Sequence, residues 1–189
     1  MRVLIACEFS GVVREAFRSR GHDAYSCDLL PAADGSPHHI QGDALWTAEN
    51  EEWDLMIAHP PCTYLAVSGA RWWKDRKKEQ HEAAQFAYML LSCAIPRVCI
   101  ENPIGYLSTY VRKPEQIIQP WQFGHGETKA TCLWLNTLPK LVPTNIVSGR
   151  TPRVHHESPG IVNGLTRQQR RSITLQGIAD AMAEQWGSL

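Results

Sequence analysis

The sequence predicts an α/β fold built around a mostly parallel sheet. Through the first half of the chain, runs of branched apolar residues alternate with segments of helical periodicity, and each run ends at a polar or turn-forming residue. Strands joined through helices are expected to be parallel, with right-handed crossovers. The chain has 189 residues, 43% hydrophobic and 20% charged, and is therefore expected to bury its own core as one domain, 1–189.

The elements are expected in a regular order along the chain. Strands are predicted at 2–8, 23–28, 38–43, 53–59, 97–101 and 130–135. Helices are predicted at 12–21, 74–94 and 166–186, where Gly21 and Pro96 stop the first two. A region rich in proline, glycine and histidine at about 137–165 predicts an irregular loop.

Charge and targeting signals narrow the class of protein. Nineteen basic and nineteen acidic residues give a formal net charge of zero, which argues against a strongly basic nucleic-acid-binding protein. Two local basic runs, 71–78 and 167–171, nevertheless keep a nucleic-acid substrate open. The apolar run before Glu8 is too short for a signal peptide or a membrane span, so a cytoplasmic protein without a membrane partner is expected.

Cysteine and histidine spacing gives no sign of a metal centre. The six cysteines form no CxxC pair, so neither a disulfide framework nor a thiolate zinc site is favoured. His38 and His39 are adjacent, as are His155 and His156, and adjacent side chains point to different faces of a strand or helix. Each pair therefore offers at most one convenient ligand, and no metal site is predicted.

The polar residues at the predicted strand ends are the candidates for function. "HPPCTYLAVSG" (59–69) follows a buried strand that its prolines must stop, which places Cys62 at a strand's carboxyl end, where open parallel sheets bind ligands. "EFSG" (8–11) and "ENP" (101–103) follow two other strands. Asp28 and Asp43 follow the second and third strands, where an acid can hold a ribose but more often caps a turn or helix.

Taken in order, "EFSG" (8–11), "PCTYLAVSG" (61–69) and "IENP" (100–103) resemble motifs of the cytosine C5 DNA methyltransferases. The resemblance covers about 3–135 and implies a doubly wound, mostly parallel class I methyltransferase fold, S-adenosylmethionine as cofactor and DNA, single- or double-stranded, as partner. It also implies the catalytic roles. Cys62 would add as a thiolate to carbon 6 of cytosine, making carbon 5 nucleophilic enough to take a methyl group.

The same resemblance assigns the partners of Cys62. Glu101 would hydrogen-bond or protonate ring nitrogen 3, with a pKa raised by its apolar strand end, and Asn102 would fix the turn. The target carbon is inaccessible inside a duplex, so the base would be flipped out or presented on a single strand.

Cofactor and substrate residues transfer in the same way. Phe9, Ser10 and Gly11 would line the methionine and adenine side, Asp28 would bind the ribose, Asp43 would meet the adenine amino group, and Pro60 or Pro61 would pack near the adenine ring. The segment after Cys62 would face nucleic acid through Ser68, Arg71, Trp72, Trp73 and Lys74, with tryptophan stacking on bases and cations on phosphates. The alternative interpretation of that segment is the solvated start of a helix.

The sequence also departs from the family. The family's "QxRxR"-like motif aligns with "ETKATCLWL" (127–135), where Lys129 takes the place of one arginine and Thr131 stands where the other would be. Residues 136–166 are too few for a target recognition domain, so sequence specificity is expected to be low or supplied by a protein partner. Compact relatives of this kind occur among phage and prophage genes.

Three other interpretations remain open. The Pro-Pro pair after a strand also resembles the amino-methyltransferases, with Cys62 in the place of their aromatic residue and Tyr64 left to stack on a base. A free pyrimidine nucleotide as substrate would explain the missing recognition domain. A degenerate methyltransferase fold would bind nucleic acid or a partner without catalysis. His59 and His125 flank the predicted site and could donate hydrogen bonds there, although surface or core histidines are commoner.

Overall fold

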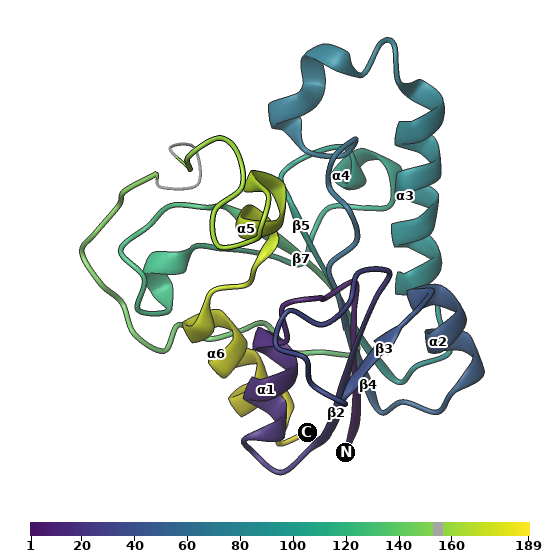
Figure 1. Ribbon diagram of the computed structural model, residues 1–189, viewed down its shortest axis with the longest axis vertical. Helices are drawn as coiled ribbons and strands as arrows, with labels where there is room; N and C mark the ends of the chain where they lie inside the picture. The colour runs from purple at the N-terminus through teal and green to yellow at the C-terminus, as the bar shows by residue number, and fades with distance from the viewer. Residues whose placement is uncertain (153–156) are drawn as a thin grey trace.

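The computed structural model, which describes residues 1–152 and 157–189, is organised around one seven-stranded sheet of order β3-β2-β1-β4-β5-β7-β6 (Figure 1). The strands are β1 (Arg2–Ala6), β2 (Asp23–Asp28), β3 (His39–Gln41), β4 (Leu55–Ala58), β5 (Arg97–Pro103), β6 (Gln116–Ile118) and β7 (Thr131–Asn136). The first five strands pair in parallel, while β7 runs antiparallel to both β5 and β6. The prediction of a mostly parallel sheet is confirmed.

Helices cover both faces of this sheet (Figure 1). They are α1 (Val12–Arg18), α2 (Ala44–Asn50), α3 (Lys77–Leu91), α4 (Leu107–Tyr110), α5 (Arg167–Ser172) and α6 (Gln176–Trp186), with 3-10 helices η1 (Val67–Trp72) and η2 (Pro120–Gln122). Successive strand residues point to opposite faces, so Val3 and Ile5 of β1 pack with α1 and α6, whereas Leu4 and Ala6 pack with α2 and α3. Each fully buried aliphatic side chain stabilises the fold by about 1.5–3 kcal/mol, and both faces of the central strands contribute.

Element boundaries differ from the prediction at the places that matter for the site. The first strand ends at Ala6 rather than Glu8, because Cys7 takes a positive φ of 59° that turns the chain toward α1. The predicted third strand is only three residues long, and α2, which the prediction lacked, follows it. The expected helix at 74–94 spans only Lys77–Leu91, because the chain before it coils into η1 and a turn.

The C-terminal helical region is broken in two. α5 begins at a capping box between Thr166 and Gln169 and ends where Ile173 becomes extended. Three residues later α6 begins, and it packs beside α1. In the described parts of the loop region, 137–152 and 157–165, the chain forms isolated bridges but no helix or strand.

No helix in the described ranges is both long and apolar enough to cross a lipid bilayer.

Candidate active site

The segment that carries Cys62, residues 59–66, is fixed against the chain that follows β5. We call it the Cys62 loop. Tyr106 N donates to the Leu65 carbonyl over 2.8 Å, and a Cβ at Gly105 would collide with that same carbonyl. Only glycine therefore lets the two segments approach so closely. The contact holds the Cys62 loop at the carboxyl edge of β4 and β5, beside Glu101.

Glu101 is the centre of this edge, and three side chains act on its carboxyl group. His59 Nδ1 donates to Glu101 Oε2 over 2.9 Å, and the two side chains are only 8% and 16% exposed. Thr131, whose Oγ1 donates to the Lys129 carbonyl over 3.2 Å, also lies close enough to favour the ionised carboxylate, and Lys129 adds a positive charge. Burial alone would raise the pKa of Glu101, but the hydrogen bond and charge of His59, followed by Lys129 and Thr131, hold that pKa below its usual value. The expected raised pKa is wrong: His59 was considered as a hydrogen-bond donor in the site, but Glu101 was not predicted as its acceptor.

Cys62 lies on the exposed side of the loop, within the electrostatic reach of Glu101. Partial desolvation of its sulfur raises the pKa of the thiol, and the negative charge of Glu101 raises it further. Lys129 and Arg171 act in the opposite direction. The thiol form therefore predominates at neutral pH, and these two cations are the groups that favour the thiolate.

The Asn102 side chain connects β5 to Pro60, two residues before Cys62. Its Nδ2 donates to the Pro60 carbonyl over 2.8 Å, and the residue is almost completely buried. The Asn102 Oδ1 atom is also buried and has no hydrogen-bond partner within the described ranges. Asn102 thus ties β5 to the Pro60 carbonyl and keeps one buried acceptor unused.

Helix α5 closes the far side of the site. Lys129 Nζ donates to the Arg171 carbonyl over 2.9 Å, and Gln168 Nε2 donates to Thr63 Oγ1 over 3.1 Å. These contacts join α5 to the chain just before β7 and to the Cys62 loop. The basic run 167–171 was the one signal in the sequence for Arg171, and local patterns did not place that run beside Cys62.

The predicted nucleic-acid-facing segment divides into exposed and packed residues. Trp72 is 58% exposed, and the Arg71 guanidinium lies 4.9 Å from its ring centroid. Trp73 instead packs edge-on against Tyr106, with ring centroids 5.9 Å apart. Ser68 and Lys74 are exposed. Of the two tryptophans, Trp72 is the one that presents its ring to solvent.

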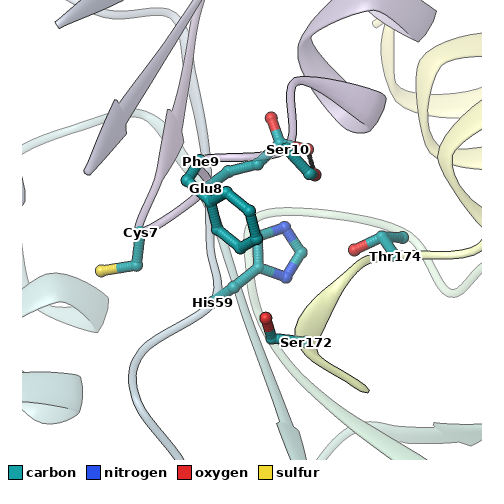
Figure 2. Close-up of a pocket in the computed structure, with 7 residues that line it drawn as sticks. All are labelled: Cys7, Glu8, Phe9, Ser10, His59, Ser172 and Thr174. Atoms are coloured by element: carbon teal, nitrogen blue, oxygen red, sulfur yellow. Dashed lines mark hydrogen bonds between the residues drawn. The ribbon is translucent and has the colours of Figure 1, made fainter. Parts of the chain in front are cut away.

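A small pocket lies between the β1–α1 turn and the chain after β4 (Figure 2). Its lining residues are Cys7, Glu8, Phe9, Ser10, His59, Ser172 and Thr174. Phe9 and Ser10 were predicted for the cofactor, whereas Ser172 and Thr174 were not, because their placement depends on the break between α5 and α6. Gly11 has a φ of 76°, and a Cβ there would collide with the Arg14 guanidinium.

Asp28 and Asp43 lie on the same edge of the sheet and both make local contacts. Asp43 is the N-cap of α2, where its Oδ1 accepts from Leu45 N at 2.8 Å and Trp46 N at 2.9 Å. Asp28 Oδ1 accepts from Leu30 N at 2.9 Å. The capping role considered for both acids is thus present. Pro60 is buried beneath this edge, while Pro61 is exposed.

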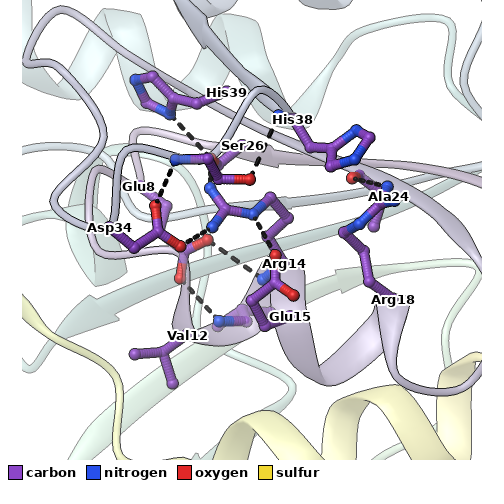
Figure 3. A network of polar contacts seen from close by, with 12 residues as sticks. Glu8, Val12, Arg14, Glu15, Arg18, Ala24, Ser26, Asp34, His38 and His39 are labelled. Carbon is purple, nitrogen blue, oxygen red and sulfur yellow. Dashed lines mark hydrogen bonds and ion pairs between the residues drawn. The ribbon is translucent and has the colours of Figure 1, made fainter.

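Beneath the pocket, a network of polar contacts holds the β1–α1 turn (Figure 3). Buried Glu8 accepts from Val13 N at 2.7 Å and from Arg14 N at 3.2 Å. The fully buried Arg14 side chain forms ion pairs with Asp34 and with Glu15, and donates to a serine of β2. Burial raises the pKa of Glu8, although the charge of His59 and the two backbone donors oppose that rise.

Within residues 1–152 and 157–189, no group of three His, Cys, Asp or Glu side chains is arranged to hold a metal ion. His155 and His156 lie outside the described residues.

The overall fold is similar to that of a solved structure. A prophage protein of Escherichia coli described as a DNA modification methyltransferase superposes with a TM-score of 0.52 and 13% identity over 86% of this chain. The chain has a class I methyltransferase fold. An rRNA methylase from Escherichia coli gives a TM-score of 0.42 and 15% identity over 71% of the chain.

This chain spans 56% and 55% of the lengths of those two structures. No protein-family model matches the sequence, and no curated protein matches it.

Proposed function

We propose that this chain uses S-adenosylmethionine to methylate carbon 5 of cytosine in DNA, through a covalent adduct with Cys62. The observation that carries the proposal is the convergence of Cys62, Glu101 and Lys129 at one carboxyl edge of a methyltransferase fold. The motif resemblance supports the same assignment, and the prophage protein of similar fold is described as a DNA modification methyltransferase.

In this proposal Cys62 is the nucleophile. Its sulfur adds to carbon 6 of the ring, which places negative charge on the ring and makes carbon 5 reactive. The charges of Lys129 and Arg171 favour the thiolate that this step requires. Lys129 would thus replace one arginine of the family's motif, acting through its charge on Cys62 and Glu101.

Glu101 faces ring nitrogen 3, where charge develops as the sulfur adds. Thr131 helps to hold the pKa of Glu101 low, so in this proposal the departure from the family's arginine acts on Glu101 rather than on the base directly. Asn102 keeps the Pro60 carbonyl and the start of the Cys62 loop in register with β5.

The pocket residues fit the charge pattern of S-adenosylmethionine. Glu8 is a buried acid beside the pocket and suits a cationic amino acid group, and the Ser10, Ser172 and Thr174 hydroxyls can bind its carboxylate. Asp28 would hold the ribose, Asp43 the adenine amino group, and Phe9 and Pro60 the apolar faces. When bound, the cofactor supplies an electrophilic methyl group.

The substrate would meet the exposed side of the Cys62 loop. Trp72 offers a ring for base stacking, and Arg71 and Lys74 offer charge for phosphates. We further propose that residues 1–189 act as a single catalytic domain in the cytoplasm, and that a protein partner supplies any sequence specificity.

Methyl transfer from labelled S-adenosylmethionine to single-stranded DNA, duplex DNA and free deoxycytidine monophosphate tests the proposal. Digested DNA should contain labelled 5-methylcytosine. Labelled N4-methylcytosine or N6-methyladenine would instead favour an amino-methyltransferase, and label in the free nucleotide alone would favour a nucleotide-modifying enzyme. Cofactor binding without transfer to any of the three would contradict the enzyme assignment.

A further inference from the structure

His59 links the two halves of the candidate site. Its Nδ1 donates to Glu101 at the end of β5, while its ring lines the pocket that contains Glu8 at the end of β1 (Figure 2). The imidazole therefore lies between two buried carboxyl groups from different strands. Its Nε2 atom is buried and has no hydrogen-bond partner in the described part of the chain.

We propose that His59 and Glu101 hold one proton between them, and that this pair delivers it to ring nitrogen 3 when Cys62 adds to the pyrimidine. The inference rests on the proposed function and names a residue which that function did not require. His59 is a positioning residue, because it acts on the base only through Glu101.

The geometry explains why Glu101 needs a partner. A buried carboxyl group that accepts a hydrogen bond from an imidazole 2.9 Å away is held in its ionised form, and an ionised carboxylate can only accept. Nitrogen 3 requires a donor as the negative charge develops. The proton must therefore reside elsewhere in the resting site, and the imidazole is the group that touches the carboxylate.

The proposed step balances in atoms and charge. The Cys62 thiolate gives an electron pair to carbon 6, and the electrons displaced in the ring form a bond from nitrogen 3 to the shared proton. That proton leaves His59 Nδ1, passes through the Glu101 carboxyl group and ends on nitrogen 3, so His59 becomes neutral and Glu101 is again ionised. The pair thus changes from neutral to one negative charge, and the movements reverse when the sulfur leaves.

The charged groups around His59 are consistent with this role. Glu101 faces it from β5 and Glu8 from the end of β1, while Cys62 lies on its own segment. Lys129 acts on Glu101 and Cys62, and Arg14 is ion-paired with Asp34 below Glu8. A proton on the imidazole is therefore matched by nearby negative charge.

Two variants separate proton sharing from simple positioning. His59→Asn can still donate a hydrogen bond to Glu101 through its amide but holds no titrating proton, whereas His59→Ala removes both contributions. His81→Asn is the matched control, because His81 lies exposed on α3.

The first measurement needs no substrate. Carbon-13 NMR of the Glu101 carboxyl group should give a pKa below the ordinary value in the wild type and in His81→Asn. In His59→Ala the pKa should rise, since burial then acts with less opposition. An unchanged Glu101 titration in His59→Ala would overturn the pairing.

The second measurement is exchange of the carbon 5 hydrogen of cytosine in single-stranded DNA, which follows from thiol addition and needs no methyl donor. The wild-type rate should be bell-shaped in pH, rising as the Cys62 thiol ionises and falling as the pair loses its proton. His59→Asn should be slower by about 10²- to 10⁴-fold, the usual contribution of a general acid, and should lack the falling limb.

The outcomes distinguish this inference from the function on which it rests. Wild-type rate and pH profile in His59→Asn would leave the function standing and overturn proton delivery. If the wild type exchanges no cytosine hydrogen while Glu101 still responds to His59, the cytosine reaction and proton delivery both fail, and the pair is only a structural contact.

Discussion

The β1–α1 turn and the edge formed by the Cys62 loop and β5 lie side by side on one sheet, yet they satisfy their buried polar atoms differently. In the turn, Arg14 is fully buried, but Asp34, Glu15 and Ser26 all contact its guanidinium (Figure 3). Glu8 accepts two backbone hydrogen bonds from the start of α1. The turn is therefore built to be stable without a ligand.

The neighbouring edge is built in the opposite way. In the described ranges, four buried side-chain atoms lack a hydrogen-bond partner. His59 Nε2 and Asn102 Oδ1 belong to this edge, while Trp73 Nε1 follows η1 and Arg171 Nε lies in α5, which contacts the Cys62 loop. Buried polar atoms are normally paired, so unused capacity gathered in one place indicates a surface prepared for a ligand. The comparison teaches that one region is satisfied by its own contacts and acts as scaffold, whereas the other keeps polar atoms unused, and it is this edge that we propose as the reacting surface.

The largest expected effect is on the reacting surface. Cys62→Ala should lower methyl transfer by about 10⁴-fold or more, as removal of a nucleophile does, with the thermal unfolding midpoint unchanged because Cys62 is exposed. Cys93→Ala, a partly buried cysteine at the end of α3, is the control and should retain activity. Comparable activity in both variants would remove Cys62 from the mechanism.

Glu101→Gln should lower the rate by about 10²- to 10⁴-fold, because the amide cannot pass a proton to the base. Single-turnover rates with saturating DNA would measure this, and cofactor affinity should stay within twofold. If cofactor affinity falls as much as the rate, Glu101 also supports cofactor binding, and its assignment to the reacting edge alone is wrong.

Arg14→Met tests the β1–α1 turn through the stability of the fold rather than through activity. It removes the cation from a buried network and should cost about 3–5 kcal/mol in the free energy of unfolding, measured by urea denaturation. Arg18→Met, on the same helix but only partly buried, should cost about 1 kcal/mol, the worth of its one bond to the Ala24 carbonyl. Equal losses would contradict the special role of the Arg14 network.

Trp72→Ala should weaken single-stranded DNA binding by about 1–3 kcal/mol, the usual value for stacking of one base. Trp46 is the matched control, since it is 61% exposed compared with 58% for Trp72 but lies on α2. Fluorescence anisotropy with a labelled oligonucleotide would separate them. A larger loss in Trp46→Ala would place the DNA path along α2 rather than along η1.

The smallest effects are opposite pH dependences of stability. The pKa of Glu101 is lowered on folding, so its ionised form stabilises the fold above the ordinary carboxyl value of 4.5, and this contribution is lost as pH falls through the lowered pKa. The pKa of Glu8 is raised, so its contribution is present below 4.5 and lost as pH rises through the folded value.

Both trends would be measured by urea denaturation of the wild type, Glu101→Gln and Glu8→Gln from about pH 3 to about pH 8, in steps of about one pH unit. The stability of the wild type relative to Glu101→Gln should shrink toward low pH, and relative to Glu8→Gln it should shrink toward high pH. Parallel trends would show that the two carboxyl groups share one environment.

Local sequence patterns were sufficient to predict much of the fold and the neighbouring strand-end positions of Cys62 and Glu101. The strands carrying Cys62 and Glu101 are continuous apolar runs ended by polar or proline residues, and parallel strands must expose their carboxyl ends together. The helix at 74–94 was too long, because local periodicity could not show that Trp73 packs on Tyr106 and holds the preceding chain as η1.

Contacts between distant parts of the chain could not be predicted. His59 and Glu101 are 42 residues apart, and their hydrogen bond reverses the expected direction of the Glu101 pKa. Lys129 meets Arg171 across another 42 residues, and the α5–α6 break that brings Ser172 and Thr174 to the pocket depends on that docking. Such pairings depend on tertiary packing, which periodicity does not report.

The most direct test of the central claim is covalent trapping on DNA containing 5-fluorocytosine, which has no hydrogen to lose from carbon 5 after methylation. Intact-protein and peptide mass spectrometry should find a cofactor-dependent adduct on Cys62 in the wild type and none in Cys62→Ala. Methyl transfer to ordinary cytosine with no adduct on Cys62 would contradict the account.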